Sequence, residues 1–375
     1  MASMLSRRGS RMWKVTILVL VTSLPAFTQG VSVEQLGQTL TTLKAAKASD
    51  GAIARAIGLM ELSEHLTDYT LDRMKVEFKP GPKTILSLEF LSYSSTFLDP
   101  PPTELPERDP PDEAADQAML IAANHFVAST LGHMPDFLAT RTTRSFDNSS
   151  VAVSHPGTPP SQLQLMGTMS QEITYRDGRE TALENSSISK FKSSREESGP
   201  GLTSQGEFGP ILATVLGDSS RGSVSWSHWE RTSVGFAAVF HYEVPAHVSH
   251  YMVDFCCENE DFPDFPGSFY HGTPAYHGSL FVDPTTGAIL RITLEAELDP
   301  SGPLINSAVS VEYGSVDIGG KSYICPVQSV AVSSARSYLV KESRETTVHR
   351  LNQVVFTNYH RFGSTVRMLT VPPTP

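Results

Sequence analysis

Cysteine is scarce in this chain: its 375 residues include only three, at Cys256, Cys257 and Cys325. An odd number leaves at least one thiol unpaired within a monomer, and three cysteines cannot form the dense disulfide framework of a small secreted domain. Three interpretations stay open: a structural bond from Cys256 or Cys257 to Cys325, a bond within the adjacent pair, or buried reduced thiols. We favour a structural disulfide over a redox role. The core must come from burial of apolar side chains.

Motifs of known catalytic and cofactor sites are absent from the sequence. There is no G-x-S-x-G turn for a nucleophilic serine, no H-E-x-x-H helix for zinc and no C-x-x-C pair. A triad assembled from distant residues would leave no such local motif. The missing motifs favour a protein that is not an enzyme, and the sequence predicts no cofactor.

Basic residues are fewer than acidic ones: the chain has 29 Lys and Arg and 40 Asp and Glu, which gives a formal net charge of -11. An acidic surface repels phosphate backbones and anionic lipids, so nucleic acid is not expected as a partner. The apolar run near the start of the chain is too short to span a bilayer, and no second run reaches that length. We therefore expect no transmembrane anchor.

Residues 1–30 have the three parts of a secretory signal peptide. Four basic residues come first: Arg7, Arg8, Arg11 and Lys14. The apolar run 15–21 follows, and then small or polar residues up to the expected cleavage between Ala26 and Val31. Removing the four basic residues takes the formal charge from -11 to -15. The leader predicts a secreted or periplasmic protein.

A helical region is expected over residues 31–135. Ser32 followed three residues later by Gln35 is a capping box, which begins a helix with apolar residues at helical spacing. Further helices are predicted to begin at three positions: Asp50, Thr70 and Pro82. Within the region, the acidic linker 99–111 contains six prolines. We expect this linker to be extended and without regular structure.

After residue 135 the hydrophobic period changes from helical to two, which predicts an antiparallel β domain over 136–375. The alternation is clearest at 288–298, where Leu290, Ile292 and Leu294 are expected on one face. A short apolar helix after Pro210 is predicted to cover this face. The fold class is α+β: a helical N-terminal region, then a large antiparallel meander in an open half-barrel-like sheet with a covering helix.

Four phrases together resemble a family of uncharacterised secreted bacterial proteins. They are L-A-T-R-T-T at 138–143, G-E-F-G-P-I-L at 206–212, S-W-S-H-W-E at 225–230 and Y-I-C-P at 323–326. The resemblance implies the compartment and the architecture, and no activity. Residues 205–362 also loosely resemble the curved β-sheet of periplasmic lipoprotein carriers, which holds acyl chains. This second resemblance is a pattern of turns and implies a fold only.

The densest group of metal-ligating residue types lies between 241 and 277. Imidazole, thiolate and carboxylate groups all bind zinc. The candidate ligands are His247, His250, His271 and His277. Since His247 and His250 are three residues apart, they face opposite sides of a regular strand. We therefore interpret these histidines as strand-end residues rather than as a metal site.

An apolar ligand is the other candidate, because aromatic residues follow one another closely after residue 225. Its proposed contacts are Trp226, Trp229, Leu290 and Ile292. The favoured interpretation is a secreted or periplasmic non-enzymatic protein that binds an apolar small molecule or an envelope protein. The alternative is an extracytoplasmic enzyme, such as a metal-assisted hydrolase, that uses the His, Asp and Glu residues at 241–277.

Overall fold

The computed structural model describes most of the chain after the expected leader. The described ranges are 30–131, 133–148, 163–176, 179–182, 207–232, 235–256, 269–339 and 344–361. The expected leader up to residue 29 and the acidic stretch 257–268 lie outside the described residues.

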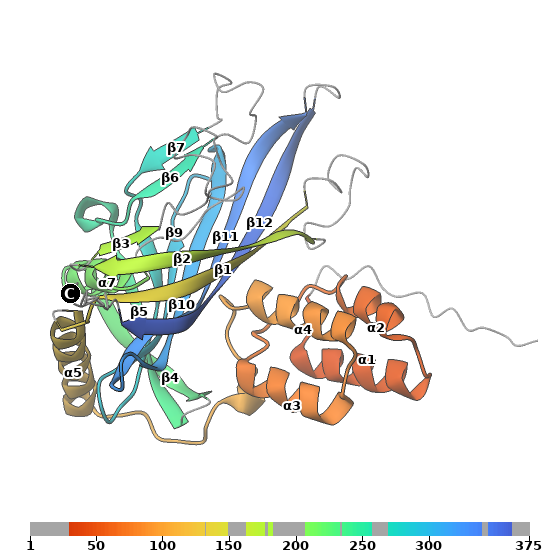
Figure 1. Ribbon diagram of the computed structural model, residues 1–375, viewed down its shortest axis with the longest axis horizontal. Coiled ribbons are helices and arrows are strands. Elements are labelled where there is room, and N and C mark those ends of the chain that lie inside the picture. Colours follow the sequence, from red (N-terminus) through yellow and green to blue (C-terminus); the bar gives the residue numbers. More distant parts are fainter. Residues whose placement is uncertain are drawn as a thin grey trace, which may run out of the picture.

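The structure has the predicted α+β class, with helices first and strands after them (Figure 1). The helices are α1 (Val33–Ala45), α2 (Asp50–Ile57), α3 (Asp68–Phe78), α4 (Pro82–Ser94), α5 (Glu113–Leu131) and α7 (Pro210–Ser219). Two 3-10 turns are η1 (Pro102–Glu104) and η2 (Ala246–Val248). Among the described residues, no helix combines the length and apolar character needed to cross a membrane.

Ten strands form one antiparallel sheet in the order β3-β2-β1-β12-β11-β10-β9-β8-β5-β4, and β6 and β7 pair separately. The first strands are β1 (Phe137–Asp147), β2 (Gln164–Arg176), β3 (Arg179–Ala182), β4 (Ser223–Thr232), β5 (Gly235–Val244) and β6 (Val253–Cys256). The others are β7 (Phe269–Gly272), β8 (Tyr276–Val282), β9 (Ile289–Ala296), β10 (Leu304–Asp317), β11 (Ser322–Leu339) and β12 (Arg344–Arg361). The predicted pairing of sequence neighbours is confirmed, except that the β6–β7 hairpin is separate and β5 pairs with β8.

Local signals explain where the N-terminal helices begin. Ser32 Oγ accepts a hydrogen bond from the Gln35 amide at 3.2 Å, and Gln35 Oε1 accepts from the Ser32 amide at 2.9 Å, so the predicted capping box is present. Helix α3 begins earlier than the predicted Thr70, because Thr67 caps it and accepts from the Thr70 amide at 3.2 Å. Pro82 opens α4 as predicted.

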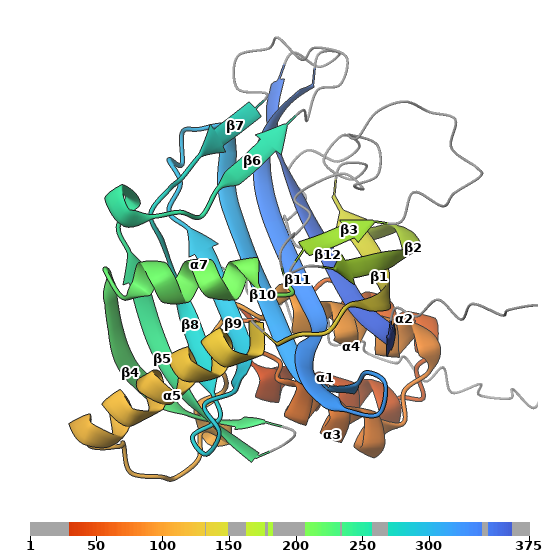
Figure 2. The ribbon, with the colours of Figure 1, turned by 60° about the vertical axis from the view of Figure 1, so that its left-hand side comes forward.

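Helices α5 and α7 cover one face of the sheet, which we call the inner face (Figure 2). Leu212, Val215 and Leu216 of α7 belong to the same buried cluster as Ile292 and Leu294 of β9. The prediction that the helix after Pro210 covers this face is therefore confirmed. Helix α5 contributes to the same cluster, so it packs on the sheet even though the sequence groups it with the N-terminal helices.

The turn between β8 and β9 brings the backbone close to α5. Gly287 has a φ of 73°, which favours glycine, and a Cβ added there would lie 2.5 Å from the Ala122 carbonyl carbon. Asp283 Oδ1 accepts from the Thr285 amide at 2.7 Å and supports the turn. Gly287 therefore permits both the tight turn and the contact with the helix.

Helices α1–α4 form their own core and pack against the opposite face of the sheet, which we call the outer face (Figure 1). Phe90 and Tyr93 of α4 contact a buried cluster that contains Phe146 of β1 and Val330 of β11. The Phe90 and Phe146 ring centroids are 5.4 Å apart. The N-terminal helices are thereby fixed against the sheet by aromatic burial.

Candidate functional site

A β-bulge in β4 orients the side chains that form the candidate site. Trp226 pairs with Phe240 and His228 pairs with Val239, so Ser227 is the additional residue. The shift places Trp226 and Trp229 together against the inner core, with ring centroids 4.9 Å apart. It leaves His228 and Glu230 on the outer face.

A second bulge, in β9, corrects one prediction. Phe281 pairs with Arg291, but Val282 pairs with Ile289, so Leu290 has no partner of its own. Leu290 therefore packs with the outer-face cluster of Ala237, Val239 and Phe281 instead of lying beside Ile292. The alternation expected from the sequence fails here because the additional residue turns two consecutive side chains to the outer face.

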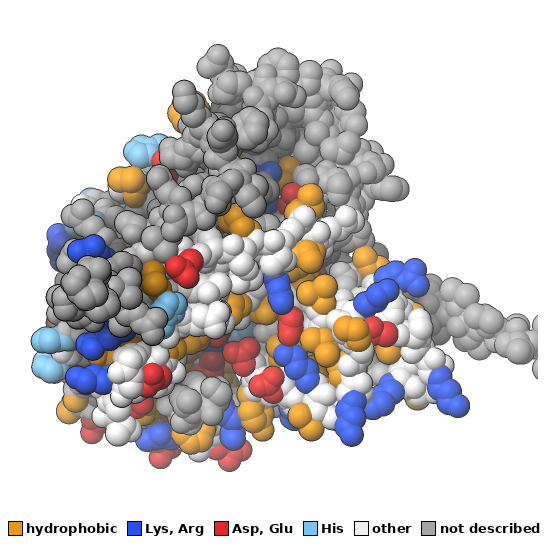
Figure 3. Space-filling view, viewed as in Figure 1, with side chains coloured by type: hydrophobic (Ala, Val, Ile, Leu, Met, Phe, Trp, Pro, Cys, Tyr) orange, Lys and Arg blue, Asp and Glu red, His pale blue; other side chains and the backbone are white. Residues whose placement is uncertain are grey.

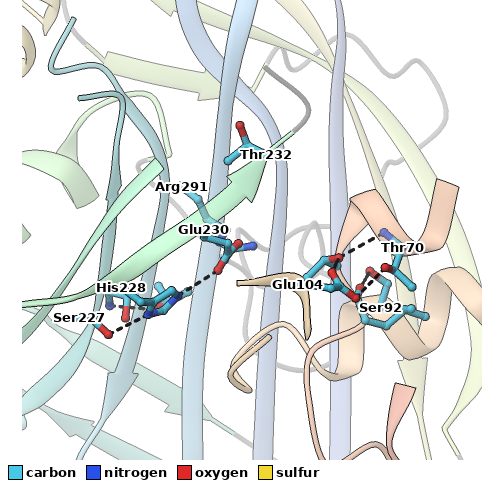
Figure 4. Close-up of polar contacts among 12 residues, drawn as sticks. Thr70, Ser92, Glu104, Ser227, His228, Glu230, Thr232 and Arg291 are labelled. Atoms are coloured by element: carbon cyan, nitrogen blue, oxygen red, sulfur yellow. Dashed lines mark hydrogen bonds and ion pairs between the residues drawn. The ribbon is translucent and has the colours of Figure 1, made fainter. Parts of the chain in front are cut away.

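The outer face carries a buried ion pair (Figure 4). Arg291 Nη2 donates to Glu230 Oε1 at 2.8 Å, and the Arg291 guanidinium carbon lies 3.7 Å from the centroid of the Phe281 ring. His228 Nε2 lies 3.5 Å from Glu230 Oε2, and the other ring nitrogen is 2.9 Å from Ser227 Oγ. Glu230 is thus held between a guanidinium and an imidazole.

The acidic side chains on the outer face have different pKa values because their surroundings differ. Burial alone would raise the pKa of Glu230, but Arg291 and His228 lower it to about 2. Burial raises the pKa of Glu312 to about 7, with Asp68 adding to the rise. Burial likewise raises the pKa of Asp68. At neutral pH, Glu230 is ionised while Glu312 is divided between its two forms.

A cavity of about 210 Å³ lies between the start of α3 and the outer face. Its lining includes Thr67, Asp68, Glu230, Phe281, Arg291 and Glu312. These side chains come from the first turn of α3 and from β4, β8, β9 and β10. Figure 3 shows acidic side chains gathered in the region between the N-terminal helices and the sheet.

Several buried polar atoms around this cavity lack a hydrogen-bond partner in the described part of the chain. They are His65 Nδ1, His228 Nε2, Glu230 Oε2 and Arg291 Nε. Burial, followed by the nearby charge of Arg291, lowers the pKa of His65 to about 3, so its ring is neutral. Two of these atoms, His228 Nε2 and Glu230 Oε2, face each other at 3.5 Å, so they form one long ionic contact. Of the four residues only Glu230 and Arg291 line the cavity. Because buried polar groups are normally satisfied, their remaining hydrogen-bonding capacity makes the cavity a candidate polar site.

The proline-rich linker holds the cavity's helical side in place. Glu104 accepts hydrogen bonds from Thr67 Oγ1 at 2.5 Å and from Thr70 Oγ1 at 2.6 Å (Figure 4). Farther along, the Asp109 carbonyl accepts from Trp229 Nε1 at 2.9 Å. Apart from η1, the linker has no regular structure, as predicted. Its contacts tie the start of α3 and β4 to the same segment.

The structure does not bring the four candidate metal ligands together. His250 Nδ1 is 2.6 Å from Asp218 Oδ1 at the end of α7, whereas His271 lies 3.9 Å from Asp254 in the separate hairpin. His277 faces His241, with ring centroids 5.9 Å apart, and His247 lies in η2. Across the described ranges, no group of three or more His, Cys, Asp or Glu residues is arranged to hold a metal ion.

The candidate apolar site is closely packed. Trp229 and Ile292 are buried in the inner core and Trp226 packs against it. A nearby cavity between α5, α7 and the sheet, which none of the four candidate residues lines, measures about 20 Å³. This is close to the space of one water molecule, for which roughly 10–15 Å³ suffices. The tryptophans therefore act as core residues here.

Of the three cysteine side chains, the structure describes only that of Cys325. Cys325 is a buried free thiol, and burial raises its pKa to about 12, which keeps it protonated. Cys257 and the side chain of Cys256 lie outside the described residues. A bond within the adjacent pair thus stays a prediction.

Sequence reasoning missed the acidic cavity. Glu230 stands in the quoted phrase S-W-S-H-W-E, but a single charged residue in an alternating strand normally faces solvent. Asp68 and Glu312 are 244 residues apart in the numbering and share no local motif. The spacing of Trp226 and Trp229, which a regular strand would place on opposite faces, was the one available signal for the bulge.

The chain was compared with protein-family models, with curated proteins and with solved structures. None of the three comparisons found a match.

Proposed function

We propose that this chain is an extracytoplasmic binding protein that takes up a small polar molecule in the outer-face cavity. The observation that carries the proposal is a 210 Å³ cavity bordered by the buried carboxylate of Glu230 and by Arg291, whose Nε has no hydrogen-bond partner among the described residues. A ligand that bonds to both groups removes the free-energy cost of leaving buried polar atoms unpaired. Typical pockets for drug-sized ligands measure about 300–1,000 Å³, so the ligand is smaller than that class.

The cavity volumes favour this site over the apolar one. The space beneath α5 and α7 is about 20 Å³ and lined by groups such as Leu212 and Ile289, which leaves no room for an acyl chain. The outer-face cavity has about 210 Å³. We therefore keep the binding role expected from the sequence, but we propose a polar ligand in place of the apolar one.

An enzyme remains the alternative, at this cavity rather than among the histidines. The pKa of Glu230 is lowered to about 2 and that of Glu312 is raised to about 7. Two carboxyl groups whose pKa values are pushed apart suit general acid–base chemistry. Turnover of a bound compound, followed by mass spectrometry, would favour this alternative.

A thermal-shift screen of small polar metabolites of both charge signs tests the binding proposal. Leu290→Trp fills the cavity, because Leu290 lines it. Leu59→Trp is the matched control, since Leu59 is 59% exposed. We expect at least one compound to stabilise the wild type and the control but not Leu290→Trp.

The same preparations can be titrated with a fluorescent fatty acid, for which no saturable binding is expected. Stabilisation that is equal in Leu290→Trp and wild type would place the ligand elsewhere and contradict the proposal. Saturable binding of the fatty acid would instead favour the apolar ligand expected from the sequence.

A further inference from the structure

The charges that border the outer-face cavity are unequal. Three carboxyl groups, those of Asp68, Glu230 and Glu312, stand against the guanidinium of Arg291. That guanidinium is already engaged by Glu230 at 2.8 Å and by the Phe281 ring. Once Asp68 and Glu312 are ionised, a ligand in the cavity therefore meets an excess of negative charge and of hydrogen-bond acceptors.

The second arginine of the cavity does not correct this imbalance. Arg231 is exposed, and its guanidinium carbon lies 5.4 Å from the Tyr69 ring centroid and 5.6 Å from that of Phe236. These aromatic contacts hold Arg231 at the rim. Its charge is exposed to solvent and is screened there.

An independent observation indicates that the acidic groups await a donor. Glu230 is 5% exposed, and its Oε2 atom lies 3.5 Å from His228 Nε2 without forming a regular hydrogen bond among the described residues. A carboxylate oxygen has two lone pairs, so Oε2 can accept a shorter hydrogen bond than this contact, and an ammonium group has three N–H donors to offer it. Arg291 Nε also lacks a partner and needs a ligand oxygen.

We propose that the ligand of this cavity is a small organic cation, a primary amine that places its ammonium group among Asp68, Glu230 and Glu312. This inference rests on the proposed function, because it names the chemical class that the same cavity takes up. A hydroxyl elsewhere on the ligand accepts from Arg291 Nε. The ammonium group forms charge-assisted hydrogen bonds, which are stronger than neutral ones.

Binding of the amine is coupled to release of a proton. The pKa of Glu312 is about 7, so a fraction of the molecules carries a neutral Glu312 near neutral pH. An ammonium ion favours the carboxylate form, so it lowers this pKa and the proton leaves to solvent. Affinity for the amine therefore increases as pH rises through 7.

The groups that face Glu312 come from every element around the cavity. They are Asp68 on α3, Glu230 and Arg231 on β4, Arg291 on β9 and the neutral His65 before α3. Asp72 and Lys75, 3.8 Å apart one turn along α3, act on Asp68 with opposite signs. Burial raises the pKa of Asp68 as well as that of Glu312, which reaches about 7.

Three probes that differ at one end test the ligand class by isothermal titration calorimetry of the full mature chain. They are 4-aminobutan-1-ol, butane-1,4-diol and 4-hydroxybutanoate, which are cationic, neutral and anionic. We expect the amine to bind, with the diol and the anion weaker by about tenfold or more, the effect of losing a charge-assisted hydrogen bond. Affinity for the amine should rise about fivefold to tenfold from pH 6 to pH 8.

Glu312→Gln should weaken amine binding at pH 8 and remove its pH dependence, while the exposed Glu297→Gln control leaves both unchanged. If Glu312→Gln does not fold, Asp68→Asn provides the second variant. Tighter binding of 4-hydroxybutanoate would overturn the amine inference and leave the polar cavity as the binding site. The inference also fails if none of the three probes binds, while the metabolite screen separately decides the proposed function. Amine binding that Glu312→Gln, Asp68→Asn and Leu290→Trp all leave unchanged would overturn both.

Discussion

Arg291 of β9 and Glu230 of β4 form a hydrogen bond of 2.8 Å although β8 and β5 lie between their strands. The guanidinium lies over the Phe281 ring of the intervening strand β8, with its central carbon 3.7 Å from the ring centroid. The two side chains are 13% and 7% exposed. This pair joins one edge of the sheet to its middle on the face that carries the cavity.

We predict that Arg291→Met destabilises the protein by about 3–5 kcal/mol, because it leaves Glu230 as a buried charge without its partner. Urea unfolding gives the free energy, and Arg231→Met at the exposed rim is the control. The double variant Glu230→Gln/Arg291→Met should lose less than Arg291→Met alone, since no buried charge is then left. A loss below 1 kcal/mol in Arg291→Met would show that the pair is not buried as described.

Glu104→Gln should loosen the linker from α3. It removes the charge from two hydrogen bonds, with Thr67 and Thr70, and we expect a loss of roughly 1–3 kcal/mol. Limited proteolysis should then cleave within 99–111 faster than in the wild type. Glu107→Gln, at an exposed position of the same linker, should change neither the stability nor the cleavage rate. Release of a stable fragment from the wild type by cleavage near Asp109 would contradict the tethered linker.

Stability should depend on pH through Glu312. Its pKa is about 7 in the folded chain against 4.5 for an ordinary Glu, so the folded state binds the proton more tightly. The stability that this group provides is therefore present at low pH and is lost as pH rises from 4.5 to 7. Glu312→Gln should gain stability relative to the wild type between pH 5 and pH 8, measured by urea unfolding. If the difference in unfolding free energy between Glu312→Gln and the wild type does not change with pH, Glu312 is not a buried, protonated group.

Export remains a prediction from the leader. We expect the protein expressed in its native compartment to begin between Ala26 and Val31, as determined by N-terminal sequencing. The Val31 amide, near the start of the described residues, donates to the Glu61 carbonyl at 2.7 Å. Cleavage within this interval thus leaves that contact intact. Recovery of a chain that starts at Met1 would refute the prediction.

Local chemistry made several elements predictable from the sequence. The capping box of Ser32 and Gln35, the opening Pro82 and the turn at Asp283 act over a few residues, so their signals are complete in a short stretch of chain. Alternation likewise predicted that Ile292 and Leu294 would meet the helix after Pro210. That helix continues past Gly217 to Ser219, since glycine weakens a helix without always ending it.

The tertiary structure alone decided which charged side chains became buried. The bulge at Ser227 turned Glu230 to the outer face, and the bulge at Leu290 turned Leu290 and Arg291 there together. A bulge adds one residue to a strand, so the side chains beyond it lie on the face opposite to the one that regular alternation predicts. The sequence by itself therefore determined the helices, the turns and most of the inner core. The acidic cavity arose only when α3 packed over strands far away in the chain, because burial and the resulting pKa shifts require both surfaces.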